Sequence, residues 1–575
     1  MTGFRVCLVV GLLAGLVWLY VPAAYAAEPD GPERLISRQE AIYISVLEQL
    51  KAKGKKSRRL NKADQEGLLT YYSDHKNPLI WVNEQGMNDR SEQLRTVFAR
   101  AGEWGLNPRD YSLPDPQDFA DLSDRPSAKL AEAELKTSLV TVTYARHAQA
   151  GRFKPSSISE DLDKHPEFPD SAKVLKGVAE KGDEIPAFLE SYNPQNRQFK
   201  ALKKLLKDID DFKGKRTVRI PDGPSLGPGT SHPHIALLHE RLKVKPTASA
   251  DEHASPEEYY DDDLAEAVRA FQESQGLGTD GIVGGNTRAV LNQAASDDDG
   301  VPYVKKSTII ANMERWRWEA RDFGKRHIIV NIPEFVFRLV EDGKIIHKER
   351  IVAGSRKHPT PIFTDEMVTV VFNPYWNVPK SILTKEILPA IRRDPSFIDR
   401  NRLEVVSGGR GADDFFFFDW MDVDPDKLRL RQIPGAGNAL GNVKFLFPNK
   451  HSVYMHDTPT KHLFKKRVRA FSHGCMRVRN PLKFAEVLLA DQGWSAKRVR
   501  NAVGAQNDYE IPLKRKVAVH IMYFTLWADK DGKIRHFSDI YGHDKRTKTA
   551  LHLERARKAE VAENDEDAGE HGLGN

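Results

Sequence analysis

The chain has 575 residues, of which 40% are hydrophobic and 29% are charged, and its formal net charge is +6. This length is too great for one hydrophobic core, so roughly three or four domains are expected. The composition is ordinary for a soluble protein, and no basic run is interleaved with aromatic residues, so a nucleic-acid-binding protein is not expected.

The first 26 residues have the pattern of a secretory signal peptide. An apolar run over 6–21 follows a basic residue, and Ala24-Tyr25-Ala26 forms a small-x-small cleavage site. The run is shorter than the roughly 20 residues that a transmembrane helix needs, so cleavage is favoured over a permanent anchor. The alternative is that the segment is not cleaved, in which case it would anchor the protein to a membrane. Because Cys7 lies in this segment, Cys475 is expected to be the one cysteine of the mature protein.

Helical periodicity dominates the N-terminal half of the chain. Residues 27–65 are polar and are expected to form a helix and a linker, and helical spacing of apolar residues continues over 66–219, as in 131–147. A Pro/Gly/Ser-rich linker follows at 220–232. Residues 233–295 again carry apolar residues at helical spacing, which predicts a small helical unit.

The region over 305–545 opens with a predicted β-hairpin. Phe335, Phe337 and Leu339 lie at alternating positions, and the turn pair Asp342-Gly343 follows them. A second apolar run then returns over 345–352.

The remaining elements of this region are less regular. Residues 381–393 have helical spacing, and the segment 376–438 around them is expected to be a lid over the site. Two late strands are predicted over 517–527 and 534–537. The charged tail over 550–575 has no large apolar clusters and is expected to be disordered.

Residues 472–478, Ser-His-Gly-Cys-Met-Arg-Val, surround the lone cysteine. Exported proteins usually carry cysteines as disulfide pairs, so Cys475 is either a reactive nucleophile, an inert buried thiol or a metal ligand. Gly474 allows close backbone approach and leaves amide groups free to face a substrate oxygen. Asn480-Pro481 predicts a helix start nearby, whose dipole, together with Arg477, would favour the thiolate if both lie close.

Residues 452–459 alternate in a way that predicts a strand ending at Asp457. Period-two geometry places Tyr454 and His456 on one face of it. A histidine at a strand end is well placed to act as the base for a thiol nucleophile, and a half-buried structural histidine is the alternative.

Zinc binding is an alternative for this stretch, because several histidines lie close to the cysteine in sequence. His451, His456, His462 and His473 do not repeat a paired-ligand spacing. No metal is therefore expected.

Two motifs together closely resemble the signature of the L,D-transpeptidase catalytic domain, a cell-wall cross-linking family with a cysteine nucleophile. They are Tyr454-Met455-His456-Asp457-Thr458-Pro459 and 472–478. Four further segments resemble the large, multidomain Gram-negative branch of this family: 311–318, 360–363, 372–379 and 438–445. This similarity covers about 305–545.

The helical regions also resemble parts of that branch. Residues 66–219 are similar to its helical scaffold domain. Residues 267–272, Asp280-Gly281 and Thr287 follow the order of a peptidoglycan-binding domain, with an acidic insert at 248–263 as the main departure. A degenerate copy that only spaces its neighbours is the alternative. The implied fold is α+β and multidomain: a mainly-β catalytic domain with a helical lid, a helical scaffold domain and a small three-helix peptidoglycan-binding domain.

The resemblance implies a periplasmic enzyme of a Gram-negative bacterium and gives its residues roles. Cys475 would be the nucleophile and His456 the base. Loop and oxyanion support would come from Ser472, His473 and Gly474, and substrate contacts from Tyr454, Arg477, Tyr375 and Trp376. Partners would be the stem peptides and glycan of peptidoglycan, carbapenem-type compounds would inhibit, and no cofactor is implied.

The implied reaction releases D-alanine from a tetrapeptide stem, leaves a cysteine thioester, and joins two third-position diaminopimelate residues. The same thioester can instead be resolved by a lipoprotein lysine, a free D-amino acid or water, and the sequence does not select among these acceptors. A cell-wall cysteine endopeptidase is a second alternative, although such families place the cysteine before the histidine. A non-catalytic wall-binding protein is the third.

Overall fold

A computed structural model describes residues 37–53, 61–119, 127–212, 218–247, 255–299, 304–406, 420–505 and 507–553. The expected signal peptide with Cys7 lies outside these residues, as do 407–419 of the expected lid and 554–575 of the charged tail. In the described part of the chain, no helix has the length and apolar character needed to cross a membrane.

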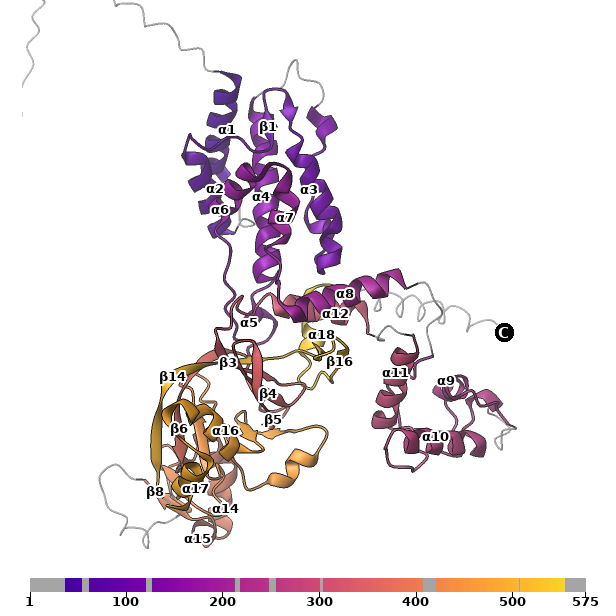
Figure 1. Cartoon of the computed structure of the whole chain (residues 1–575), viewed down its shortest axis with the longest axis vertical. Helices are drawn as coiled ribbons and strands as arrows, with labels where there is room; N and C mark the ends of the chain where they lie inside the picture. The colour runs from indigo at the N-terminus through magenta and orange to yellow at the C-terminus, as the bar shows by residue number, and fades with distance from the viewer. Residues whose placement is uncertain are drawn as a thin grey trace, which may run out of the picture.

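Helices form the N-terminal third of the chain, where the sequence predicted them. Figure 1 shows α1 to α4, α6 and α7 as a bundle at one end of the molecule, with the short α5 below it, next to the sheet region. The elements of this third of the chain are α1 (Arg38–Lys53), α2 (Lys62–Ser73), β1 (Val82–Asn83), β2 (Gly86–Met87), α3 (Arg90–Ala99), η1 (Arg100–Trp104), η2 (Pro108–Asp110), η3 (Pro116–Phe119), α4 (Ser127–Ala150), α5 (Pro155–Ile158), α6 (Ser171–Lys181), η4 (Gly182–Glu184) and α7 (Ile185–Glu190). The buried Glu134 carboxylate of α4 fixes β1, because it accepts hydrogen bonds from the amides of Ile80, Trp81 and Val82.

The next unit has three helices, as predicted. They are α9 (Pro233–Leu242), α10 (Asp262–Ser274) and α11 (Gly285–Asp299), with the short η5 (Pro256–Glu258) before α10. The Gln272 side chain fixes the turn after α10, since its amide binds the carbonyl of Ile282 and its oxygen accepts from the Gly281 amide.

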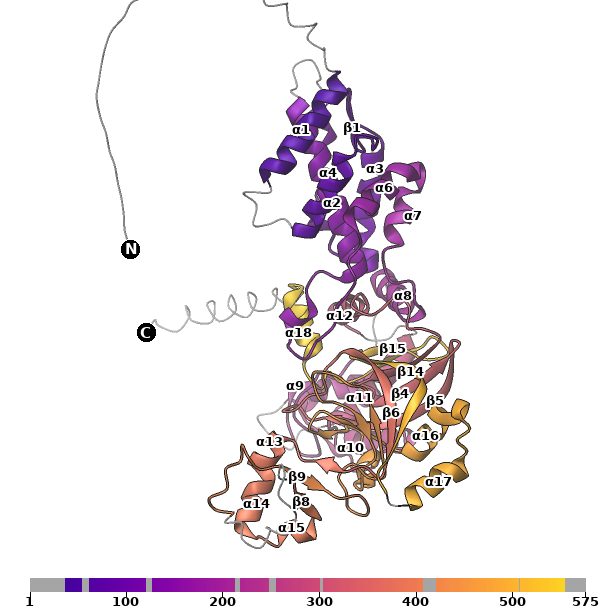
Figure 2. The same ribbon diagram turned by 90° about the vertical axis from the view of Figure 1, so that its left-hand side faces the viewer.

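Two helices, α8 (Arg197–Asp211) and α12 (Lys306–Trp316), lie between the bundle and the sheet below it (Figures 1 and 2). Both pack on the small hairpin of β15 (Leu526–Ala528) and β16 (Ile534–His536). The shared core includes Phe199, Leu202, Ile309, Met313, Trp316, Phe524 and Leu526.

The C-terminal region is built on a nine-stranded sheet in the order β12-β5-β13-β11-β10-β6-β14-β3-β4. Its strands are β3 (Arg326–Asn331), β4 (Val336–Glu341), β5 (Lys344–Gly354), β6 (Thr364–Phe372), β10 (Val443–Leu446), β11 (Met455–His456), β12 (Ala470–Ser472), β13 (Met476–Val478) and β14 (Tyr509–Met522). Because β4 also pairs with β5, the sheet closes on itself. The predicted hairpin is confirmed as β4 and β5, and Asp342 and Gly343 have the positive φ of its tight turn.

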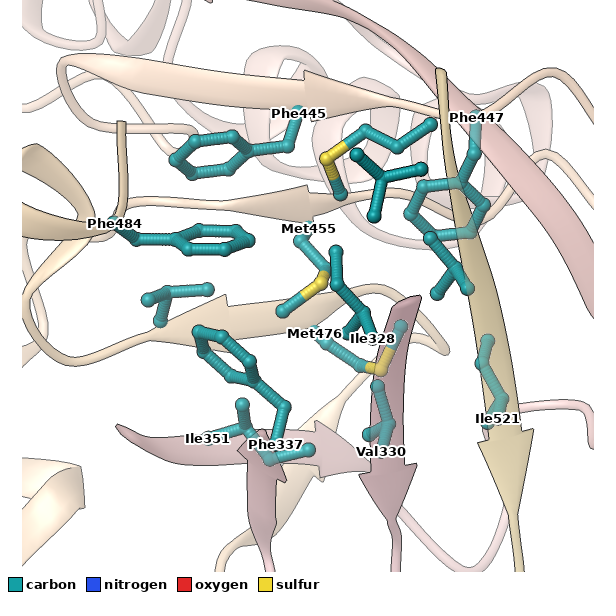
Figure 3. Close-up of a cluster of buried hydrophobic side chains, with 14 of the residues drawn as sticks. Ile328, Val330, Phe337, Ile351, Phe445, Phe447, Met455, Met476, Phe484 and Ile521 are labelled. Atoms are coloured by element: carbon teal, nitrogen blue, oxygen red, sulfur yellow. The ribbon is translucent and has the colours of Figure 1, made fainter. Parts of the chain in front are cut away.

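Alternate residues of the closed sheet fill its inside. Figure 3 shows Phe337, Phe445, Met455, Met476 and other apolar side chains packed together there. Helix α16 (Pro481–Leu489) adds Phe484 to this core, and η9 (Ala490–Gln492), α17 (Ala496–Gly504) and α18 (His543–Ala550) complete the region. The α+β architecture that the resemblance implies, with a catalytic region built on a β-sheet, is therefore confirmed.

Two predicted elements differ in detail. The strand expected over 517–527 is two strands, because the amides of Phe524 and Thr525 donate to the side chains of Asn331 and Asn312 instead of to a strand partner. The helix expected over 381–393 contains a π-turn, in the order α13 (Lys380–Ile382), η6 (Leu383–Ile387) and α14 (Leu388–Arg393). Pro389 lacks an amide hydrogen, so the helical ladder cannot run unbroken through this segment.

The segment expected to be a lid forms a small subdomain of its own, beside the sheet in Figure 2. Helices α13, α14 and α15 (Phe397–Arg400) pack on a three-stranded sheet of β7 (Trp376–Asn377), β9 (Leu430–Gln432) and β8 (Leu403–Val405). Its core includes Leu383, Leu388, Ile391, Leu428 and Leu430.

A strand-like segment from the helical half enters the core of the sheet region. Leu162 forms a parallel bridge with Ile362, and its side chain is 0% exposed within the core of the sheet region. Hydrogen bonds from Asp163 N–H to the Ile362 carbonyl (2.9 Å) and from Ile362 N–H to the Asp161 carbonyl (2.7 Å) hold it there.

Candidate active site

Cys475 lies at the end of a short, tightly bonded loop, immediately before β13. The Ser472 hydroxyl donates to the Cys475 carbonyl at 2.5 Å and accepts from the Gly474 amide at 3.2 Å. Gly474 has a φ of +113°, which side-chain-bearing residues rarely adopt. The loop therefore requires both the serine and the glycine that surround the cysteine in sequence.

Residues far away in the sequence brace this loop. Thr360 donates its hydroxyl to the Gly474 carbonyl at 2.7 Å and accepts from the Gly354 amide at 2.9 Å. The Tyr541 hydroxyl in turn accepts from the Thr360 amide at 3.2 Å and donates to the Gly354 carbonyl at 2.6 Å. Thr360 is the first residue of one of the motifs quoted from the sequence, and its role is to hold the loop.

The register of three strands sets a row of functional side chains on the outer face of the sheet. Lys444 of β10 pairs with His456 of β11, and His456 pairs with Arg477 of β13. Neighbouring Met455 and Met476 point inside (Figure 3), so the alternate residues point outward. The outward row on these strands therefore places Arg477 beside His456, and Cys475 two residues before Arg477.

Tyr454 belongs to the same row. Its ring lies 5.7 Å from the His456 ring, and the Lys444 ammonium lies 4.7 Å from the centre of the Tyr454 ring. The Cys475 thiol donates to the Ser452 carbonyl at 3.8 Å, and the described hydrogen bonds include none between this thiol and His456.

The electrostatic setting of the thiol differs from what the sequence suggested. Burial raises the pKa of Cys475, while hydrogen bonding from Tyr454 and the charges of Lys444 and Arg477 lower it only in part. The expected helix does not contribute at close range, because α16 begins at Pro481, after β13.

The residue before that helix also has another role. The Asn480 side chain makes no capping hydrogen bond, and its amide donates instead to Glu349 at 2.5 Å. The suggested N-cap is thus wrong in its chemistry, although the helix starts where the sequence placed it.

His456 is buried and neutral. Burial, then the charge of Arg477, lowers its pKa to about 3. Its Nδ1 lies 2.5 Å from the carbonyl oxygen of Asp457, which can only accept, so Nδ1 carries the proton. The Nε2 atom is therefore left as the basic nitrogen, which is the tautomer that a general base requires.

Other predicted site residues lie at the edges of this row. His473 turns toward the lid, where it pairs with Glu386 of η6 at 2.8 Å and stacks on His358 at 4.7 Å. Arg477 donates to the Thr460 hydroxyl at 2.8 Å.

The two aromatic residues predicted to contact substrate lie where the chain enters the lid, Tyr375 just before it and Trp376 at its first position. Arg431 lies over the Tyr375 ring at 4.3 Å, and Trp376 packs against the core of the lid subdomain.

Three residues were not singled out in the sequence as site residues. The Lys444 ammonium lies over the Tyr454 ring, and the Ser452 carbonyl accepts from the Cys475 thiol. The third is Asp457, whose buried carboxylate accepts from the Asn442 amide at 2.9 Å. The alternation of Val443, Lys444 and Phe445 was a usable signal, since it predicts a lysine on the face opposite the core.

The histidines near Cys475 bind different partners. His451 pairs with Asp163 at 2.8 Å, whereas His456 and His473 have the contacts given above. Across the described ranges, no group of three or more His, Cys, Asp or Glu side chains is arranged to hold a metal ion.

Comparison with known proteins gives these domains their families. Residues 325–504 match the L,D-transpeptidase catalytic domain, residues 66–206 match the scaffold domain, and residues 242–291 match a peptidoglycan binding domain. A Haemophilus influenzae protein that carries an L,D-transpeptidase name is 31% identical over 253 residues. This alignment covers 44% of the present chain and 51% of that protein, so it spans about half of the relative's length.

Solved structures were also matched. An L,D-transpeptidase from Mycobacterium smegmatis is 13% identical, with a TM-score of 0.17 over 34% of this chain and 58% of that one. An L,D-transpeptidase from Xylanimonas cellulosilytica is 16% identical, with a TM-score of 0.16 over 52% of this chain and 98% of that one. On the domain matches, the chain joins an L,D-transpeptidase catalytic domain to a scaffold domain and a peptidoglycan-binding domain.

Proposed function

We propose that this protein is a periplasmic L,D-transpeptidase that cross-links third-position diaminopimelate residues of peptidoglycan stems. The observation that carries the proposal is the outward row of Tyr454, His456 and Cys475 inside the matched catalytic domain. A peptidoglycan-binding domain in the same chain supports the substrate class. The signal-peptide pattern supports the periplasm.

In the first step, the Cys475 sulfur attacks the carbonyl that joins the third stem residue to the terminal D-alanine. His456 Nε2 takes the thiol proton, a carbon–sulfur bond forms, and the carbon–nitrogen bond to D-alanine breaks. The leaving amine receives the proton from His456. The Cys475 amide is a candidate donor to the oxyanion, because none of the described hydrogen bonds uses it, whereas the Gly474 amide already donates to Ser472.

In the second step, the side-chain amine of a neighbouring diaminopimelate attacks the thioester. His456 takes the amine proton as the new amide bond forms, and the carbon–sulfur bond breaks to restore the cysteine. The lid would exclude water from this thioester, since its η6 turn contacts the loop that carries the nucleophile. Carbapenem-type β-lactams would acylate the same sulfur.

The test is the incubation of the mature protein with disaccharide tetrapeptides, with products separated and identified by mass. The wild type is expected to release D-alanine and form a dimer linked through the third residues. Cys475→Ser, which preserves the shape of the side chain, is expected to abolish both products while leaving the thermal midpoint unchanged.

Other products would change the proposal in defined ways. Hydrolysis, D-amino-acid exchange or transfer to a lipoprotein lysine would keep the thioester and replace the acceptor. Internal cleavage of a stem would indicate an endopeptidase. Absence of D-alanine release by the wild type would sink the transpeptidase proposal and favour a wall-binding protein.

A further inference from the structure

A basic cavity of about 700 Å³ lies at the carboxyl ends of β11 and β13. The charged residues that line it are Arg350, Lys461, Lys465, Arg479, Lys483 and Asp457. The sheet brings two of them together, because the amide of Arg479 donates to the carbonyl of Arg350 on β5 at 3.2 Å. Five cations thus face one carboxylate around this cavity.

The nearby acidic groups are already engaged. Asp457 binds the ammonium of Lys461 and accepts from the Asn442 amide at 2.9 Å. Glu349, which is buried beside the cavity, pairs with Arg479 at 2.7 Å. These carboxylates neutralise only part of the positive charge. Because they are already bound to cations and to an amide, their repulsion of an incoming anion is reduced.

Two of the cations have no acidic partner within the described ranges. Among the described residues, neither Arg350 nor Lys465 takes part in an ion pair, and the Arg350 guanidinium donates only to the carbonyl of Phe464, at 3.4 Å. Both residues are exposed at the cavity. Uncompensated guanidinium and ammonium groups on one concave surface favour an anionic ligand, and guanidinium suits a carboxylate in particular.

The cavity is within reach of the nucleophile. Cys475 directly precedes the three residues of β13 and Arg479 directly follows them, so the two are four residue steps of extended chain apart, roughly 13 Å. Asp457, which directly follows His456, lines the same cavity. The lid contacts the chain at His473, before Cys475, and so lies toward the other end of β13. A peptide of about four residues can therefore join the sulfur to the cavity along this strand.

We propose that this cavity binds the free carboxylates of a stem peptide whose reacting group lies at Cys475. The proposal rests on the transpeptidase function proposed above, and it adds a carboxylate subsite made by Arg350 and Lys465. The stem can be the acyl donor or the acceptor, since both carry free carboxylates, and the two steps of the reaction separate these sources.

The experiment compares the wild type with the double variant Arg350→Gln/Lys465→Gln. Donor acylation is followed by mass as the rate at which the tetrapeptide adds to the protein, and transfer is followed as the KM for the acceptor peptide. In the double variant, either acylation is expected to be about tenfold slower or the acceptor KM about tenfold higher. Raised salt is expected to reduce this difference from the wild type, because it screens the charges of Arg350 and Lys465. The first result assigns the cavity to the donor stem and the second to the acceptor. Unchanged values for both steps would overturn the proposal.

Direct binding keeps the test separate from catalysis. The Cys475 thiol is capped with iodoacetamide, and calorimetry measures the Kd of a tetrapeptide and of its carboxyl-amidated analogue. The capped wild type is expected to bind the tetrapeptide with a lower Kd than its amidated analogue. The capped double variant is expected to bind the tetrapeptide with a higher Kd than the capped wild type does. Equal affinities would contradict the subsite even if the wild type proved inactive, so failure of the subsite and failure of the proposed function give different results.

A charge-matched control excludes a general effect of lost positive charge. Lys344→Gln/Lys497→Gln removes two exposed lysines away from the cavity, on β5 and α17. Its acylation rate, acceptor KM and Kd are expected to equal those of the wild type. Thermal midpoints of both double variants show whether each is folded, and a control that weakened binding as much as Arg350→Gln/Lys465→Gln would count against a localised site.

Discussion

Cys475 and His456 are both neutral in the structure. Burial raises the pKa of the thiol and lowers that of the imidazole to about 3, so a preformed thiolate–imidazolium pair is not the ground state. Proton transfer from sulfur to His456 must therefore accompany attack on the substrate. Movement of the thiol away from the Ser452 carbonyl would precede this transfer.

The first prediction at this scale concerns Lys444, the cation on β10 that faces the same row. Lys444→Met removes a positive charge that lowers the pKa of Cys475, so that pKa is expected to rise further. Below the thiol pKa, the rate of alkylation by iodoacetamide should fall roughly tenfold. The exposed Lys514→Met, on β14, should leave this rate unchanged. Equal alkylation rates in Lys444→Met and wild type would mean that the lysine does not act on the sulfur.

The sequence identified the candidate nucleophile and base but not their electrostatics. Cys475 and His456 follow from a compact motif whose residue types carry the chemistry. Lys444 was not found, because only the ladder between β10 and β11 brings it opposite His456. The sign of the thiol pKa shift depends on burial by strands distant in sequence, so no local pattern reveals it.

At the scale of elements, the loop over 472–475 is the most constrained part of the site. Its geometry depends on the left-handed φ of Gly474, on the Ser472 hydroxyl and on Thr360 from another motif. The amide of Cys475 takes its direction from this loop.

Gly474→Ala tests that constraint. A Cβ at this position would have ordinary contacts, the nearest at 3.6 Å from the Pro359 carbonyl oxygen, so the cost comes from the backbone conformation. The substitution should lower the free energy of unfolding by more than about 1 kcal/mol and reduce acylation, as measured by urea unfolding and by mass. Gly504→Ala, at the end of α17 with open space around it, should be neutral or slightly stabilising. A fully active Gly474→Ala would show that the loop tolerates another shape.

Elements with local signals were predicted well. The β4–β5 hairpin has a two-residue turn whose composition fixes it, and the long α4 has continuous helical spacing. The lid strands β8 and β9 pair with each other although residues 407–419 lie between them in sequence. Each has three residues, which is too short to show a period-two pattern. The π-turn in η6 is likewise invisible to a pattern that records only apolar spacing.

At the scale of the whole molecule, buried histidines make stability depend on pH. Burial lowers the pKa values of His147, His456, His520 and His543 to about 3, from an ordinary value of 6.5. The unfolded chain then binds more protons than the folded one between these values, so this stability is full above pH 6.5 and declines as the pH falls toward 3.

The urea midpoint is accordingly expected to be lower at pH 4.5 than at pH 7.5. His147→Gln removes one of the four groups, which lies in α4 with its ring 3.0 Å from the Tyr111 hydroxyl. Relative to wild type, this variant should show a flatter dependence of the midpoint on pH, even if it is less stable overall. A midpoint that rises on acidification would contradict the assignment.

The second prediction for the whole molecule concerns the segment that joins its halves. Leu162→Ala should destabilise the sheet region by about 2–4 kcal/mol, since it leaves a cavity in the core beside Ile362. Urea unfolding followed by near-ultraviolet circular dichroism measures the loss. Glu160→Ala, two residues earlier and exposed, should change stability by no more than about 0.5 kcal/mol. Equal stability in the two variants would mean that the Leu162 site collapses without cost.

Leu162 could not have been assigned to this core from the sequence. It lies far before β3 in the chain, in a short segment without periodicity, and its partner Ile362 is recognisable only after folding. The helical class, the three-helix unit and the hairpin depend on local patterns, whereas this insertion depends on a contact between distant segments.

The Leu162 contact has a consequence for how such proteins can be recombined. A fragment that starts at α12 keeps the thiol, the imidazole and the closed sheet, yet it lacks the side chain that fills the space next to Ile362. Grafting this catalytic unit onto a different scaffold would therefore require residues 159–163 to travel with it. A cut placed between the domains in the sequence would remove this segment, although it is part of the hydrophobic core of the catalytic unit.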